Sequence, residues 1–182
     1  MQYKHLSCTI NLTEKLNAQI PSIGLLVTHP ARRGDIFLLH CHYMKKITIH
    51  TDGGARGNPG PAAIGVYITD ENGAVVKEVK QAIGNSTNNF AEYHAVAVAL
   101  ETLKQLYGKA TKSMQFVLKL DSELVKKQLD GEYQIKEPGL VPLFIQIHNL
   151  RVANFPHLTF THVPRAQNKD ADRLVNEALD GK

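Results

Sequence analysis

The residues of this chain best suited to chemistry are four carboxylates, Asp52, Glu92, Asp121 and Asp172. Each is predicted at the end of a strand or in the first turns of a helix, and open α/β sheets build their sites at strand ends. Carboxylates gathered in one place repel one another unless cations lie between them. Oxygen ligands without cysteine or an obligatory histidine favour Mg²⁺, with Mn²⁺ as the alternative. The four positions therefore predict a divalent-metal site.

Each of these acids also has a purely structural explanation. Glu92 follows Asn89 by three residues, which is the spacing of a capping box. Asp121 is of a residue type that caps helices, and Asp172 would favour the positive end of a helix. Asp52 is of a type that stabilises turns. Four acids at four element ends are harder to explain in this way than any one of them, so the set favours a site.

The elements that must position these acids can be predicted from periodicity. Strand patterns cover residues 46–51, 62–70, 74–83, 114–120 and 158–163. Helical patterns cover residues 85–108, 121–131, 140–155 and 168–181, with glycines closing the first two. An Asn-Gly pair at 72–73 predicts a hairpin between the second and third strands. The order βββαβααβα predicts an α/β fold in which helices flank a mixed five-stranded sheet.

The composition is that of a soluble globular protein. Hydrophobic residues make up 43% and charged residues 21% of 182 residues, enough to bury a core. The net charge of +4 permits a polyanionic partner without requiring one. Two cysteines give no disulfide framework, and no apolar run is long enough to span a membrane. No signal peptide is recognisable, so we expect a cytoplasmic protein without membrane contact. Nothing calls for an obligatory protein partner, and we expect a monomer.

The first 43 residues differ from the rest of the chain. They show no sustained period of a strand or a helix, whereas Met44 immediately precedes the first clear strand. We therefore predict a loosely structured N-terminal extension over residues 1–43 and a functional domain over residues 44–182.

Four stretches together resemble a known family, the type 1 ribonucleases H. They occur in the family's order, with compatible spacing, across roughly residues 46–180, and they read "TDGGARGNPGPAAIG", "NSTNNFAEYHAVAVAL", "LDSELV" and "HVPRAQNKDADRLVNEAL". The resemblance implies the ribonuclease H-like fold, which agrees with the predicted order of elements. It also implies an endonuclease that hydrolyses the RNA strand of RNA–DNA hybrids and leaves 5′-phosphate and 3′-hydroxyl ends.

The resemblance assigns roles to the acidic residues and to one arginine. It implies that Asp52, Glu92, Asp121 and Asp172 bind two Mg²⁺ ions, which clamp the scissile phosphate. Arg165 resembles the arginine that replaces a loop histidine in compact members of the family. A guanidinium is not a general base at neutral pH, but it can stabilise phosphate charge.

The resemblance also implies contacts with the hybrid. Asparagine side chains would line the minor groove, a threonine would hold a DNA-strand phosphate, and glycine amides would approach the sugar. The residues that match these roles are Gly53, Gly54, Asn58, Thr87, Asn88 and Asn89.

Some features depart from the family pattern. The chain has no tryptophan, and no extra basic helix fits between Gly131 and Leu140, so we expect the basic protrusion of some members to be absent. Hybrid binding should then be weaker and salt-dependent. Glu123 stands where glutamine is common, and a role for His162 stays open. Two alternatives also stay open: a catalytically silent hybrid-binding domain, which the retained acids disfavour, and another nuclease of the same fold, which Asn88 and Asn89 disfavour.

Overall fold

The computed structural model describes residues 25–26, 38–39 and 44–181. The chain divides into two units, Met1–Tyr43 and Met44–Lys182. In the first unit, β1 (Leu25–Leu26) pairs in antiparallel fashion with β2 (Leu38–Leu39). The expectation of loose structure over residues 1–43 falls mostly outside the described residues. It therefore stays a prediction, as does the assignment of function to residues 44–182.

The second unit contains one mixed five-stranded sheet with the strand order β5-β4-β3-β6-β7. The strands are β3 (Lys46–Ala55), β4 (Gly60–Thr69), β5 (Val75–Ser86), β6 (Gln115–Leu120) and β7 (Leu158–His162). β3, β4 and β5 form an antiparallel meander, whereas β6 runs parallel to β3 and β7 runs parallel to β6. The mixed sheet predicted from the sequence is confirmed.

Four α-helices connect and cover these strands. They are α1 (Asn88–Tyr107), α2 (Glu123–Leu129), α3 (Val141–Asn154) and α4 (Lys169–Leu179). Short 3₁₀ turns lie at η1 (Gly108–Ser113), η2 (Pro138–Leu140) and η3 (Arg165–Gln167). The predicted order βββαβααβα is confirmed. No helix among the described residues is both long enough and apolar enough to cross a bilayer.

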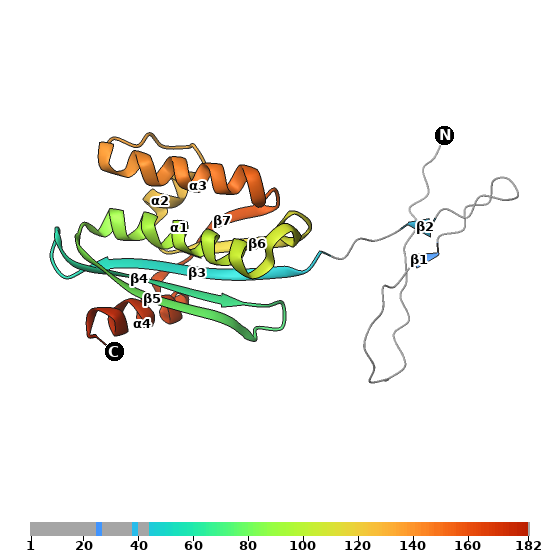
Figure 1. Cartoon of the computed structure of the whole chain (residues 1–182), viewed down its shortest axis with the longest axis horizontal. Coiled ribbons are helices and arrows are strands. Elements are labelled where there is room, and N and C mark those ends of the chain that lie inside the picture. The colour runs from blue at the N-terminus through green and yellow to red at the C-terminus, as the bar shows by residue number, and fades with distance from the viewer. Residues whose placement is uncertain (1–24, 27–37, 40–43, 182) are drawn as a thin grey trace, which may run out of the picture. The chain divides into compact units, whose positions relative to one another are not determined.

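The helices cover the two faces of the sheet unequally. Figure 1 shows α1 and α3 on one side of the sheet and α4 on the other. Successive strand residues point to opposite faces, so in β3 the buried Ile47 and Ile49 join the core under α1. His50 and Asp52 belong to the other set, on the α4 side. The same strand therefore supplies core residues to one layer and polar residues to the other.

Two glycines let the helices pack directly on the sheet backbone. A Cβ at Gly53 would collide with the backbone of Ala91 in α1, and one at Gly65 would collide with the carbonyl oxygen of Ala171 in α4. Gly65 pairs with Asp52 in the β3–β4 register. Both close approaches therefore bring helix residues to the same part of β3, where Asp52 lies.

Two boundaries differ from the sequence prediction, and both matter for the site. β3 continues past Asp52 to Ala55, because pairing with β4 down to Ala62 supplies hydrogen bonds to the glycine-rich stretch. The prediction that Asp52 ends the strand was therefore wrong. Thr87 caps α1 by accepting a hydrogen bond from the backbone N–H of Phe90, so Glu92 lies in the second turn rather than the first.

The connection between α2 and α3 is short. Residues 130–140, all of which the structure describes, form a loop and the three-residue turn η2, and they contain no α-helix. The expected absence of a helical basic protrusion at this place is therefore consistent with the fold.

Candidate metal centre

The open end of the sheet beside β3 creates the site. β6 ends at Leu120, opposite Thr51, while β3 continues for four more residues to Ala55. Among the described residues, no strand pairs with this last part of β3 on the β6 side. Side chains from both faces of the sheet and from the end of β6 can therefore meet at this point.

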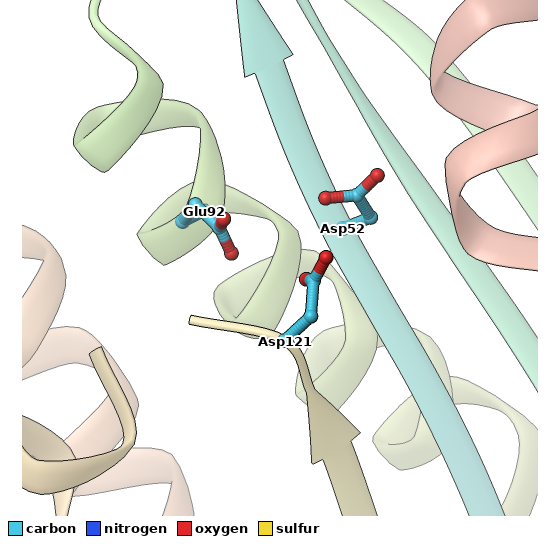
Figure 2. A group of neighbouring side chains, drawn as sticks. All are labelled: Asp52, Glu92 and Asp121. Carbon is cyan, nitrogen blue, oxygen red and sulfur yellow. The ribbon is translucent and has the colours of Figure 1, made fainter. Parts of the chain in front are cut away.

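Three carboxylates converge there. Asp52 comes from β3, Asp121 directly follows β6, and Glu92 reaches in from α1, as Figure 2 shows. One carboxylate oxygen from each lies within 4.8 Å of the others, close enough for shared cation ligands. The side chain of Asp52 is buried, whereas Glu92 and Asp121 are partly exposed. The structure thus brings together three of the four acids that the sequence singled out.

Burial and mutual repulsion change the acidity of this cluster. Burial, followed by the charges of Asp121 and Asp172, raises the pKa of Asp52 to about 6. Burial, followed by the charges of Asp52 and Asp121, raises the pKa of Glu92 to about 9. Arg165 opposes both shifts with its positive charge. These carboxylates retain protons because too little positive charge lies near them, and a bound divalent cation would supply that charge. The all-oxygen set of donors fits Mg²⁺ or Mn²⁺.

The structural explanations of these acids largely fail. Ser122, rather than Asp121, caps α2 by accepting a hydrogen bond from Val125. Thr87 caps α1, so Glu92 forms no capping box with Asn89. The positions of Asp121 and Glu92 are therefore not accounted for by helix capping.

The fourth acid, Asp172, lies beside the cluster rather than in the group of three. It sits in the first turn of α4, where one carboxylate oxygen accepts a hydrogen bond from Arg165 at 2.6 Å. The other oxygen accepts a hydrogen bond from Asn176 at 3.1 Å. Its charge still raises the pKa of Asp52. Metal binding by Asp172 stays a prediction.

The side chain of Arg165 is largely exposed to solvent. Its exposed fraction is 76%, and within the part of the chain that the structure describes it pairs only with the carboxylate of Asp172. An exposed guanidinium of this kind can exchange that carboxylate for a phosphate oxygen without desolvation. The predicted phosphate-stabilising role is compatible with this position and stays a prediction.

Asn168 is a site residue that sequence reasoning missed. Its side chain is fully buried and contacts three neighbours. The amide nitrogen donates to the Thr51 carbonyl at 2.9 Å and to an Asp121 carboxylate oxygen at 3.2 Å. Its amide oxygen lies 3.2 Å from Nδ1 of His50. The available signal was an asparagine at the first position of a predicted helix, but this residue type is common there simply as a cap.

Two of the predicted substrate contacts, Asn58 and Asn88, form a separate group on the surface, which we call the asparagine rim. Asn88 accepts a hydrogen bond from the backbone N–H of Ala55 at 2.7 Å, and the backbone N–H of Asn88 donates to the side-chain oxygen of Asn58 at 3.2 Å. Both asparagines are exposed. Within the described part of the chain, their side-chain NH₂ groups have no protein partner. These donors are therefore available to a ligand.

The other predicted contacts lie close by. Asn89 lines a hollow of about 500 Å³ together with residues of α2 and of the following loop. The hydroxyl oxygen of Thr87 is engaged in capping α1. The lack of a side chain at Gly53 is needed for packing of α1, and Gly54 faces Val175 of α4. Sugar approach by these two glycines stays a prediction.

Two further candidates lie away from the three carboxylates. Glu123 is exposed at the start of α2 and pairs with Lys127 at 2.8 Å, which lowers its pKa. His162 is exposed at the end of β7. Neither belongs to the group of three carboxylates.

Comparisons with known proteins point to one family. A family model described as "Reverse transcriptase-like" matches residues 50–178. Ribonuclease HI of Halobacterium salinarum is 41% identical over 135 residues, which cover 74% of this chain and 65% of that protein. A bifunctional protein of Mycobacterium tuberculosis is also 41% identical over 136 residues, which cover 74% of this chain. The chain spans only 36% of the length of that mycobacterial relative.

Solved structures give the same result. An RNase H1 isolated from compost by a metagenomic approach has a TM-score of 0.72 and 49% sequence identity, covering 76% of this chain and 98% of that protein. That RNase H1 in complex with an RNA/DNA hybrid has a TM-score of 0.71 and 48% identity, over 74% of this chain and 97% of the other.

Proposed function

Because the chain belongs to the type 1 ribonuclease H family, we propose that it is an endonuclease that hydrolyses the RNA strand of RNA–DNA hybrids. One observation carries the proposal: carboxylate oxygens of Asp52, Glu92 and Asp121, from three separate elements, lie within 4.8 Å of one another. A relative bound to an RNA/DNA hybrid supports the choice of substrate. We also propose that the domain acts as a monomer without an obligatory protein partner.

The carboxylates would hold two Mg²⁺ ions, with Mn²⁺ as a substitute. Asp52, Glu92 and Asp121 supply the ligands, and Asp172 adds a fourth carboxylate from the α4 side. When bound, such ions supply an activated water for in-line attack and charge stabilisation for the leaving 3′ oxygen, which gives 5′-phosphate and 3′-hydroxyl products. The raised pKa values of Asp52 and Glu92 support this assignment, because both carboxyls are poised to release protons when positive charge arrives.

Arg165 would neutralise phosphate charge at the edge of the cluster. Its guanidinium donates hydrogen bonds and accepts none, so it cannot remove a proton from water. Its exposure and its single pairing with Asp172 allow it to reach a phosphate oxygen next to the carboxylates. Arg165 is therefore not the group that takes up the proton of the attacking water.

The rim asparagines would recognise the hybrid. A protein distinguishes RNA from DNA through the 2′-hydroxyl and the shape of the minor groove. The groove edges of all bases carry acceptors, and a 2′-hydroxyl oxygen is also an acceptor. The outward NH₂ groups of Asn58 and Asn88 are donors that match them. Thr87 would hold a DNA-strand phosphate, and Asn89, which lines the hollow next to α2, would lie along the minor groove.

A cleavage assay with four labelled substrates tests the proposal. The substrates are an RNA–DNA hybrid, double-stranded DNA, double-stranded RNA and single-stranded RNA, each with Mg²⁺ and with a chelator. We expect cleavage of the hybrid alone, in its RNA strand, only with Mg²⁺, and with 5′-phosphate ends on the products. Binding of the hybrid without cleavage would instead indicate a silent binding domain. Cleavage of double-stranded DNA would indicate another nuclease of this fold.

A further inference from the structure

Asn168 occupies a helix N-cap position without serving as a cap. Its side chain makes no capping hydrogen bond to α4, although asparagine is among the preferred capping residues. It is instead fully buried and directed at the end of β6. Its backbone oxygen still accepts a hydrogen bond from Asp172 at 3.1 Å, so it remains fixed to the first turn of α4.

The neighbours of this amide determine its orientation. The Thr51 carbonyl and the Asp121 carboxylate only accept hydrogen bonds, so the NH₂ group of Asn168 must face them. A reversed amide would bring three oxygens together in a buried place. The amide oxygen therefore faces His50, and Nδ1 of His50 must carry the hydrogen that it receives at 3.2 Å.

This chain of hydrogen bonds links β3, the end of β6 and the start of α4, three of the four elements that carry the proposed metal ligands. His50 and Thr51 belong to β3 immediately before Asp52, Asp121 follows β6, and Asn168 begins α4. Removing the His50 donor would leave a buried amide oxygen without a hydrogen-bond donor, which is unfavourable. The amide would then gain by turning or shifting, and Asp121 would lose its fixed donor.

We propose that His50 and Asn168 form a positioning pair, in which His50 fixes the amide of Asn168 and Asn168 holds the Asp121 carboxylate in its metal-binding orientation. Neither residue belongs to the group of three carboxylates, so the pair would act through Asp121. Its consequence for cleavage rests on the proposed function, whereas its consequence for metal affinity does not. Partners of metal ligands typically change affinity or activity by about 10–100-fold when removed.

Two variants of similar shape separate positioning from folding. In His50→Asn the side-chain nitrogen can take the place of Nδ1 and donate to Asn168. His50→Leu has a branched side chain of similar size with no donor. Leucine suits a strand better than asparagine does, so a merely structural role of His50 predicts that the leucine variant is the better of the two. A positioning role predicts the reverse order.

The first measurement is the Mn²⁺ affinity of the hybrid-free protein by titration calorimetry. We expect about 10-fold weaker affinity for His50→Leu and less than about threefold weaker affinity for His50→Asn. The second measurement is hybrid cleavage, where kcat should fall about 10-fold for His50→Leu while KM for the hybrid changes less than about twofold. His157→Leu, at an exposed histidine outside this network, should match the wild type in both.

Wild-type Mn²⁺ affinity in His50→Leu, or equal weakening in both His50 variants, would overturn the proposal. The thermal unfolding midpoint of each variant checks that the variant is folded at the temperature of the titration and the cleavage assay. His50→Phe is a second variant without a donor, since it keeps the edge-to-face ring contact with Tyr67, and it should behave like His50→Leu. If the wild type binds Mn²⁺ but cleaves no hybrid, the proposed function fails. The Mn²⁺ affinities of the His50 variants still test the positioning pair in that case.

Discussion

The metal centre and the asparagine rim lie next to each other and are built in opposite ways. Asp52 is buried on a central strand, and Glu92 is set by a helix that packs against the Gly53 backbone. Asn58 and Asn88 are exposed, and each side chain is held by one hydrogen bond to a backbone N–H. The core therefore fixes the groups proposed for chemistry, while the surface presents the groups proposed for recognition.

The metal centre and the asparagine rim also differ in what they cost the stability of the fold. Buried carboxyls whose pKa is raised are unfavourable in the metal-free fold, because the cluster must keep protons or accept repulsion. The rim carries no such cost, since its polar groups remain in water. Changes at the centre should therefore affect the rate constant and alter stability with pH, whereas changes at the rim should mainly affect substrate affinity.

The largest effect is expected for Asp52→Asn. The change removes the central carboxylate of the cluster while keeping its shape, so several kcal/mol of transition-state stabilisation should be lost. That corresponds to a fall in kcat on the order of 10³-fold. Single-turnover cleavage of a labelled hybrid at saturating protein measures it, and circular dichroism establishes that the fold is retained.

Asp170→Asn is the matched control for that experiment. Asp170 is an exposed acid two residues before Asp172 in the first turn of α4, and it lies outside the group of three carboxylates. Its variant should cleave the hybrid within about twofold of the wild-type rate, because surface changes of this kind cost only tenths of a kcal/mol. Cleavage by Asp52→Asn at the control's rate would remove the distinction between centre and surface.

A smaller effect of unusual sign is expected for Glu92→Gln in the metal-free protein. The pKa of Glu92 is raised from an ordinary value of 4.5 to about 9. Between those values the folded protein holds a proton that the unfolded chain releases, so wild-type stability falls as pH rises through that window. Glutamine has no proton to lose. The variant should therefore be more stable than the wild type, by on the order of 1–3 kcal/mol at pH 8 and by much less at pH 5.

Chemical unfolding in a chelating buffer at both pH values tests this sign. Glu101→Gln, at an exposed position of the same helix, should change stability by a similar small amount at pH 5 and at pH 8. Adding Mg²⁺ at pH 8 should stabilise the wild type more than Glu92→Gln, because only the wild type offers the full set of ligands. Asp52 still lowers the stability of both proteins as pH rises, so the test is the difference between them: a stability difference between Glu92→Gln and the wild type that is no larger at pH 8 than at pH 5 would contradict the electrostatic account.

The same comparison shows what the sequence could predict. Periodicity located the strands and helices, and the acids Asp52, Glu92 and Asp121 stood out because they sit near element ends. The length of β3 was missed, since glycines disfavour strands and only pairing with β4 maintains this one. Asn168 was missed because its partners Thr51 and Asp121 lie 117 and 47 residues away. Local patterns carry no information about such contacts.

The smallest effect, and the sharpest test of the rim, is expected for Asn88→Asp. Aspartate keeps the oxygen that accepts the hydrogen bond from Ala55, so stability should stay within about 0.5 kcal/mol of the wild type. It replaces the outward NH₂ donor with an acceptor, and the new charge repels phosphate. KM for the hybrid should therefore rise about 5–10-fold, which corresponds to roughly 1–1.4 kcal/mol, while kcat changes less than about twofold.

Asn88→Ala separates the donor from the added charge. It removes both the acceptor for Ala55 and the outward donor, so it should lose slightly more stability than Asn88→Asp and raise KM slightly less. Steady-state kinetics at one salt concentration compare the two variants, because phosphate repulsion depends on ionic strength. If kcat rather than KM falls in Asn88→Asp, the rim is coupled to the carboxylate cluster through β3, and the division between a buried centre and a recognising surface no longer holds.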